Sequence, residues 1–227
     1  MTLYLDTTAP GAPQNLTADP AGWTNVDLFS VSWANPAELS GVAGAWYKLD
    51  VPPVSATDGT FVAGADLTSI SDLNVGDDGA HDLYLWLQDA AGNADHTQAA
   101  VVTLYLDTTA PGAPQNLTAD PAGWTNVDLF SVSWANPAEL SGVAGAWYKL
   151  DVPPVSAADG TFVAGADLAS ISDLNVGDDG AHDLYLWLQD AVGNADHTQA
   201  AVVTLYLDTT PPGAPTNLDA SPDGWQT

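Results

Sequence analysis

Apolar and polar residues alternate along several short stretches of this chain, and residues that favour turns separate these stretches. In Leu129–Trp134, the aromatic and branched residues fall on one face and a leucine and two serines on the other, which is typical of a half-buried strand. The same patterns predict strands at 116–119, 129–134, 146–152, 161–164, 168–174, 182–189 and 199–208. No stretch shows sustained helical periodicity, so the sequence predicts an all-β antiparallel sandwich of about seven strands per unit.

The whole pattern repeats along the chain. The stretch Thr-Leu-Tyr-Leu-Asp-Thr-Thr, followed after one residue by Pro-Gly-Ala-Pro, begins at residues 2, 103 and 204, a period of 101 residues. Residues 2–102 and 103–203 align without a gap and differ at three positions, Thr57/Ala158, Thr68/Ala169 and Ala91/Val192. A unit of this length can bury its own core. We therefore expect a remnant of a preceding repeat at 1–6, complete repeats at 7–107 and 108–208, and the start of a third at 209–227, as an excerpt of a longer array.

The chain is strongly acidic, because 29 Asp and Glu residues stand against two lysines, for a formal net charge of −27. Such a surface lacks the cations that phosphate groups require, which excludes nucleic acid and anionic membranes as partners. There is no run of about 18 apolar residues, so we expect no membrane insertion in this segment. The absence of cysteine excludes disulfides and thiolate chemistry.

Motifs that would support catalysis are missing from the sequence. The histidines are His81, His96 and their repeat mates His182 and His197, and no nucleophile elbow, zinc-protease motif or glycine-rich phosphate loop accompanies them. Aspartates in turns can act as catalytic carboxylate pairs, but turns favour Asp for conformational reasons as well. We predict that the chain is not an enzyme.

Several motifs resemble those of bacterial immunoglobulin-like, fibronectin type III-like tandem repeats of large repetitive surface or secreted proteins. They are Ser133-Trp134 before Asn136-Pro137, Tyr148 on the next strand, Asp-Gly-x-His before an apolar strand that ends in Asp-x-x-Gly-Asn, and the closing Leu-Asp-Thr-Thr-Ala-Pro. The resemblance implies seven-stranded immunoglobulin-like sandwiches joined by short Pro-containing linkers, and an extracellular or cell-surface location. His182 departs from the pattern, since many such domains carry there a tyrosine whose hydroxyl ties down a loop.

The aspartates of the turns are candidates for metal binding, because hard cations such as Ca²⁺ take several oxygen ligands from loops. Loops gather at the two ends of a sandwich, and the resemblance implies Ca²⁺ at the joints between repeats. The candidate ligands are Asp107, Asp190, Asn194, Asp196 and Asp208, with Glu139 as a further one. The opposite end brings Asp159, Asp178 and Asp179 as a second set. The alternative is that these acids are simply solvated turn residues.

The strand predicted at 182–189 is apolar on both faces, with leucines on one side and Tyr185 and Trp187 on the other. Only one face of a two-sheet sandwich meets the core, so these rings fall on the outer face. The residues concerned are Tyr84, Trp86, Trp147, Tyr185 and Trp187. Three interpretations stay open: a loop covers the rings, they form a stripe for association with other copies or neighbouring repeats, or they stack on sugar rings.

The joint between repeats is short and contains prolines. Pro111 and Pro114 fix the backbone and bias the residues before them to extended forms. Identical semi-rigid joints predict an extended rod or a regular superhelix. The sequence thus favours a structural repeat segment of a large extracellular protein, a stalk, adhesin or filament or sheath subunit, that extends and self-associates through the aromatic stripe. The alternative is an array of carbohydrate-binding modules that uses exposed Trp and Tyr.

Overall fold

Short strands with alternating burial make up both complete repeats in the computed structural model, which describes residues 3–218. In the first repeat the strands are β1 (Gln14–Asp19), β2 (Trp23–Thr24), β3 (Phe29–Ala34), β4 (Val42–Leu49), β5 (Thr60–Ala63), β6 (Ser69–Leu73), β7 (Gly79–Asp89) and β8 (Ala100–Leu106). In the second they are β9 (Gln115–Asp120), β10 (Phe130–Ala135), β11 (Val143–Leu150), β12 (Thr161–Ala164), β13 (Ser170–Leu174), β14 (Gly180–Asp190) and β15 (Ala201–Leu207). The short 3₁₀ helices η1 (His96–Gln98) and η2 (His197–Gln199) precede the last strand of each repeat.

Each repeat is a two-sheet sandwich. One sheet has the order β1-β3-β6 in the first repeat and β9-β10-β13 in the second. The other has the order β2-β8-β7-β4-β5 in the first and β15-β14-β11-β12 in the second. The pairings are antiparallel except between β2 and β8, where Trp23 lies opposite Tyr105 in a parallel register. The fold is therefore all-β and immunoglobulin-like, with sheets of three and five strands in the first repeat and of three and four strands in the second.

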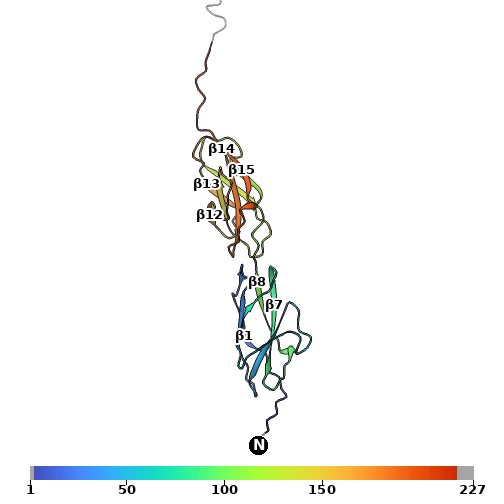
Figure 1. Ribbon diagram of the computed structural model, residues 1–227. Coiled ribbons are helices and arrows are strands. Elements are labelled where there is room, and N and C mark those ends of the chain that lie inside the picture. Colours follow the sequence, from blue (N-terminus) through green and yellow to red (C-terminus); the bar gives the residue numbers. More distant parts are fainter. Residues whose placement is uncertain (1–2, 219–227) are drawn as a thin grey trace, which may run out of the picture.

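The two repeats have separate hydrophobic cores, as alternation on the strands requires. The first cluster of buried residues lies within 29–106 and the second within 130–207. In the second, the face of β10 that carries Phe130, Val132 and Trp134 points inward, and the face with Leu129 and the serines does not. Figure 1 shows the sandwiches end to end, with the segment after β8 leading from one to the other.

The observed strands match the predicted ones closely and differ at their ends. Strand β11 begins at Val143, earlier than predicted, because Val143 pairs with Asp190 of β14. It ends at Leu150, since Asp151 adopts a left-handed φ of 65° and turns the chain. The last strand begins at Ala201, because η2 takes up the residues before it. The two-residue strand β2 was not predicted, since two residues give no periodic pattern.

Candidate metal centre at the joint

Asp107 lies directly after β8, where the first repeat ends and the linker to β9 begins. Its backbone N–H donates to the carbonyl of Thr24 at 2.9 Å, which continues the pairing of β2 with β8. The residue is fully buried, with 0% of its surface exposed. The carboxylate at this position is thus buried at the end of a paired strand.

Two acids of the second repeat meet Asp107 at the joint. Glu139 comes from the loop between β10 and β11, and Asp190 is the last residue of β14 and is 1% exposed. One carboxylate oxygen from each of the three residues lies within 4.8 Å of the others. We call this set the joint triad. It combines one ligand from the end of one repeat with two from the next, so it spans the boundary between them.

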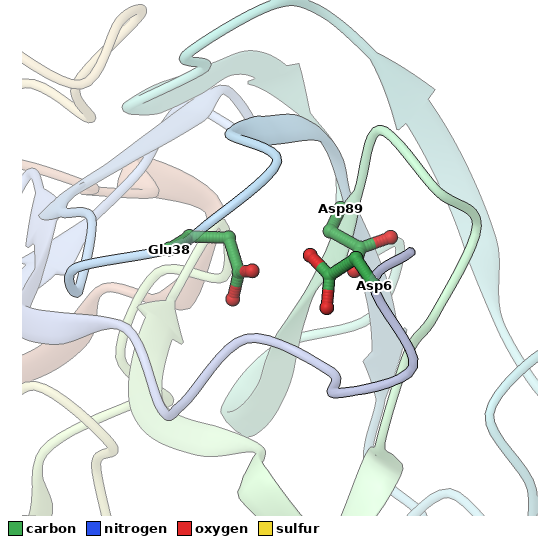
Figure 2. Close-up of side chains that lie close together, drawn as sticks. All are labelled: Asp6, Glu38 and Asp89. Atoms are coloured by element: carbon green, nitrogen blue, oxygen red, sulfur yellow. The ribbon is translucent and has the colours of Figure 1, made fainter. Parts of the chain in front are cut away.

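The same arrangement occurs at the start of the first repeat. Asp6, Glu38 and Asp89 stand at the equivalent positions, and their carboxylate oxygens also lie within 4.8 Å of one another. Figure 2 shows the carboxylates of Asp6 and Asp89 next to each other, with Glu38 reaching toward them from its loop. We call this set the N-terminal triad. Its presence shows that the repeat sequence itself builds the cluster each time.

Hydrogen bonds orient the acids of the joint triad. Asp190 accepts from the backbone N–H of Asn194 at 2.7 Å and of Val192 at 3.0 Å, and also from the Asn194 amide at 2.7 Å. The same Asn194 amide donates to the carbonyl of Asp107 at 2.8 Å. The Asp107 carboxylate accepts from the backbone N–H of Ser141 at 3.1 Å. These donors fix geometry across the joint, but they do not supply a compensating charge.

Burial, with a smaller contribution from nearby negative charges, raises the pKa values of two acids of the joint triad. Burial raises the pKa of Glu139 to about 7, and the negative charges of Asp107 and Asp190 add to the shift. Burial also raises the pKa of Asp190, with a further contribution from Asp107. Neither lysine balances this charge, since Lys149 pairs with Asp159 at 2.8 Å and Lys48 is bound in the same way in the first repeat. Buried charges require a counter-ion or a proton.

Two oxygens at the triads have unused hydrogen-bonding capacity. Among the residues that the structure describes, the buried side-chain polar atoms without a partner are Asp6 Oδ2 and Ser141 Oγ. Asp6 belongs to the N-terminal triad, and Ser141 donates its backbone N–H to Asp107 of the joint triad. Buried oxygens of this kind are rare and need an explanation. Carboxylate and hydroxyl oxygens without nitrogen or sulfur donors are the ligand set of Ca²⁺.

An open cleft of about 560 Å³ gives access to the joint triad. Its lining includes Asp107 and Glu139, together with Asp78 and Thr109 from the first repeat and the linker, and Asp196 from the second repeat. The acidic lining attracts cations toward the triad. The site therefore has buried ligands, an entry path and a negative potential that favours a divalent cation.

The remaining candidate ligands lie elsewhere or have other partners. Asn194 acts as a donor that orients the triad. Asp196 caps η2 and accepts from the N–H and hydroxyl of Thr198 at 2.9 and 2.7 Å. Asp208 follows β15 as Asp107 follows β8, and it is exposed.

The acids of the second candidate set, at the opposite end of the sandwich, have other partners in the structure. Asp159 forms an ion pair with Lys149, Asp179 accepts from the linker residues Thr209 and Thr210, and the Asp178 carbonyl lies 2.9 Å from a ring nitrogen of His182. No group of three acids that includes them has carboxylate oxygens close enough for metal binding in the described part of the chain. The carboxylates of Asp159 and Asp179 thus bind Lys149 and the linker threonines.

The two tryptophans at the centre of the outer-face rings are covered and not open to solvent. Trp187 and its mate Trp86 are on the outer face but 0% exposed. A loop covers Trp187, and the ring donates from Nε1 to the Ala157 carbonyl at 2.8 Å. A Cβ on Gly160 would lie 2.7 Å from the Trp187 ring, so glycine allows this close cover.

The half-buried Trp147 completes the covered cluster. It stacks on Trp187 with ring centroids 6.3 Å apart and contacts Phe162 at 5.0 Å. Tyr185 and its mate Tyr84 are also half-buried. Of the three interpretations that the sequence left open, the loop that covers the rings is the one that matches this packing. The sequence could not show it, because the covering loop has no periodic pattern.

No protein-family model matches this sequence, and the comparison with curated proteins finds no match. Among solved structures, the fibronectin(III)-like modules of Clostridium thermocellum CbhA are similar, with 11% identity and a TM-score of 0.36 over 88% of this chain and 93% of that one. The FN1–FN3 domains of chicken CNTN1 are similar with 13% identity and a TM-score of 0.39, over 87% and 68%.

Within residues 3–218, none of the helices is long and apolar enough to cross a membrane.

Proposed function

We propose that this chain is a structural segment of a large extracellular or cell-surface protein, in which Ca²⁺ bound at each joint fixes the orientation of successive repeats. The observation that carries the proposal is the joint triad, in which Asp107 of one repeat and Glu139 and Asp190 of the next bring three buried or half-buried carboxylates together. The partners of each repeat are then its neighbours in the array. The role is spacing and extension, and no catalysis is proposed.

The physical reason is electrostatic. In the absence of a cation, three acids at this separation oppose one another, and the raised pKa of Glu139 reflects the burial and the repulsion. A divalent cation converts that repulsion into attraction between the two repeats, because its ligands come from both. A chain with a net charge of −27 repels itself along its whole length, so bound cations also favour the packed joint over a loose one.

An extracellular location fits the expected affinity. Loop sites in extracellular modules bind Ca²⁺ with dissociation constants of about 10⁻⁴–10⁻³ M. We assign a site with three carboxylates and a cleft open to solvent to that class. The joint is then stiff where calcium is abundant and loose where calcium is scarce.

Self-packing through the aromatic rings and sugar stacking have less support. Trp86 and Trp187 are fully buried under their loops, so a partner or a sugar would first have to displace the loop. The ion pair between Lys149 and Asp159, at 2.8 Å, anchors that loop. We therefore place the association of repeats at the joints and not on the sheet faces.

The test compares two matched variants, Glu139→Gln and Glu38→Gln. The first removes a carboxylate from the joint triad and the second removes its mate from the N-terminal triad. We expect Ca²⁺ to narrow the distribution of distances between the two repeats, measured with spin labels, in the native chain and in Glu38→Gln. Glu139→Gln should lose this response.

Calorimetric titration supplies the second readout, because each variant should lose one class of Ca²⁺ site. Melting temperatures with and without chelator check that both variants remain folded. If Ca²⁺ leaves the distances and the melting temperature of the native chain unchanged, the proposal is wrong. The same holds if the two variants respond identically to Ca²⁺ in the distance measurement.

A further inference from the structure

His81 lies at the start of β7 with both ring nitrogens next to oxygen atoms. Nδ1 is 3.2 and 3.1 Å from the two carboxylate oxygens of Asp50, and Nε2 is 2.8 Å from the carbonyl of Asp77. A carbonyl and an ionised carboxylate only accept hydrogen bonds. A neutral imidazole carries one N–H and satisfies one of these partners, whereas the protonated ring donates to both. The geometry therefore selects the charged form.

The surroundings of the ring agree with this assignment. Burial lowers the pKa of His81, but the hydrogen bonds to Asp50 and to the Asp77 carbonyl outweigh it, together with the charges of both aspartates, so the net shift is upward. On the β8 side, Leu104 is in register with His81 and brings no charge. The carboxylate of Asp82, the residue after His81, has a different partner, since it accepts a hydrogen bond from the hydroxyl of Thr103 at 2.8 Å.

The turn that His81 holds is also the turn that fixes the linker. Asp78, next to Asp77, accepts from the backbone N–H and the hydroxyl of Thr108, both at 2.8 Å, and from the hydroxyl of Thr109 at 2.5 Å. The hydrogen bond from Thr109 is the largest cause of the lowered pKa of Asp78, so this carboxylate stays ionised. Thr108 and Thr109 are the first two residues after Asp107. The position of the turn thus sets the direction in which the chain leaves the first repeat.

We propose that His81 is a pH-sensitive latch of the joint: when protonated, it ties the Asp77–Asp78 turn to Asp50 and so holds the linker in one direction. When the ring loses its proton, one nitrogen presents a lone pair to an oxygen, and that contact turns from attraction into repulsion. The Asp77–Asp78 turn then loses an anchor, and Thr108 and Thr109 gain freedom. The inference rests on the part of the proposed function in which the joint sets orientation, and it does not require the cation.

The direction of the pH dependence follows from the raised pKa of His81. The protonated ring stabilises the joint fully at pH values below the ordinary histidine pKa of about 6.5. This stabilisation is lost as the pH rises through the higher pKa of the folded state. The joint should therefore be more ordered in mild acid than in mild base. His182 makes the same contacts with Asp151 and the Asp178 carbonyl. Its turn holds Thr209 and Thr210, so it acts on the linker that follows the second repeat.

The chain offers a matched control for the test because of this duplication. The experiment uses spin labels on Thr60→Cys and Thr161→Cys, two exposed and equivalent positions in a chain without native cysteine. All proteins carry Glu139→Gln and are measured in chelator. This background removes the joint carboxyl that titrates near neutrality and removes cation binding. Distance distributions are recorded by electron–electron double resonance between pH 5.5 and 8.5.

We expect the distribution in the background protein to broaden as the pH rises, and His182→Gln to leave this transition unchanged. His81→Gln should give a broad distribution at every pH. Asp50→Asn, which keeps the histidine, should move the transition about one unit lower, because the ring loses its opposite charge. Far-ultraviolet circular dichroism verifies that each protein is folded.

A distribution that does not change with pH in the background protein would overturn the latch, and so would identical behaviour of His81→Gln and His182→Gln. The cation does not enter this measurement. A failure here leaves the calcium proposal intact, and a failure of calcium binding leaves the latch intact.

Discussion

The joint triad and the N-terminal triad contain the same residues in the same repeat context, yet they differ in how completely they are built. Asp107 is 0% exposed, whereas Asp6 is partly exposed. Leu140, beside Glu139, is 50% exposed, and its mate Leu39 is 82% exposed. The difference comes from the chain that precedes each triad.

Asp107 ends β8, a strand that is paired with β7 and with β2. The segment before Asp6 has the same sequence as the end of β8 but no strand partners in the described part of the chain. Asn93 still donates to the Asp6 carbonyl at 3.1 Å, as Asn194 does to Asp107 at 2.8 Å. The pairing of β8 with β2 and β7 therefore holds Asp107 in its buried position.

The largest expected effect comes from unfolding the neighbour. Phe29 is a fully buried ring in the core of the first repeat, and Phe29→Ala should cost about 3–5 kcal/mol of its stability. Under conditions where that repeat is unfolded and the second is not, Asp107 should behave like Asp6, and the Ca²⁺ affinity of the joint triad should fall to that of the N-terminal triad. Calorimetric titration in low urea measures this.

Phe130→Ala is the matched control for that experiment, because it removes the same ring from the second repeat. It should abolish binding at the joint triad altogether, since Glu139 and Asp190 both belong to the second repeat. Unchanged affinity in Phe29→Ala would mean that the folded neighbour is not needed for the site.

The pH dependence of binding is expected to be the next largest effect. Glu139 has a pKa raised to about 7, first by burial and then by its acidic neighbours. Ca²⁺ requires the ionised form, so below this pH a proton must leave as the ion binds, and the affinity should fall by up to tenfold per pH unit, or about 1.4 kcal/mol.

In chelator the stability of the joint changes with pH in the opposite direction to the Ca²⁺ affinity. The folded-state pKa of Glu139 lies above its ordinary value of 4.5, so the protonated acid favours the folded joint and this contribution is lost as the pH rises through about 7. Titrations and melting curves between pH 5.5 and 8.5 test both statements. Glu139→Gln is the control: it should flatten the affinity profile, and in the melting profile it should remove the contribution of Glu139 while that of His81 and His182 stays. Affinity that does not vary with pH would contradict the assignment of Glu139 as a ligand.

Asp78 accepts hydrogen bonds from Thr108 and Thr109 of the linker, and we call these contacts the linker clamp. Breaking the linker clamp should have a smaller effect. Asp78→Asn weakens the hydrogen bonds from Thr108 and Thr109, and we expect a loss of about 1 kcal/mol in the stability of the first repeat. It should also broaden the distances between the two repeats. Asp179→Asn makes the same change before the linker that follows the second repeat, so it should leave those distances unchanged. An equal broadening in both variants would argue against a local clamp.

The smallest expected effect concerns Asp196, a residue that the sequence suggested as a ligand. Its carboxylate caps η2 through Thr198, and hydrogen bonding to Thr198 lowers its pKa. Asp196→Ala should leave the Ca²⁺ affinity of the joint triad within about twofold. Asp190→Asn, which changes a member of the triad, should reduce the affinity much more. A large loss in Asp196→Ala would add this residue to the ligand set.

Periodicity predicted the fold of this chain well, because alternation on a strand directly encodes which face is buried. The inward face of β10, with Phe130, Val132 and Trp134, was readable from the sequence alone. The cover over Trp187 was not, since it depends on a loop whose path is set by Gly160, the Ala157 carbonyl and the Lys149–Asp159 ion pair. Such contacts have no regular spacing.

The candidate site was predicted in part for a similar reason. Asp107 and Asp190 stood out as acids at loop ends, and Glu139 was a weaker candidate. Nothing in the spacing distinguished them from Asp196, whose partner is the nearby Thr198. The distinction comes from burial across the joint, which requires two folded repeats. The role of Ser141, whose hydroxyl is buried without a partner, also depends on that packing.

A crystal structure of this chain grown with Ca²⁺, with anomalous scattering to locate the ion, tests the central claim most directly. We predict a calcium ion at the joint with oxygens of Asp107, Glu139 and Asp190 at about 2.3–2.6 Å. A structure at saturating Ca²⁺ that holds the same joint but shows no ion between these three carboxylates would contradict it.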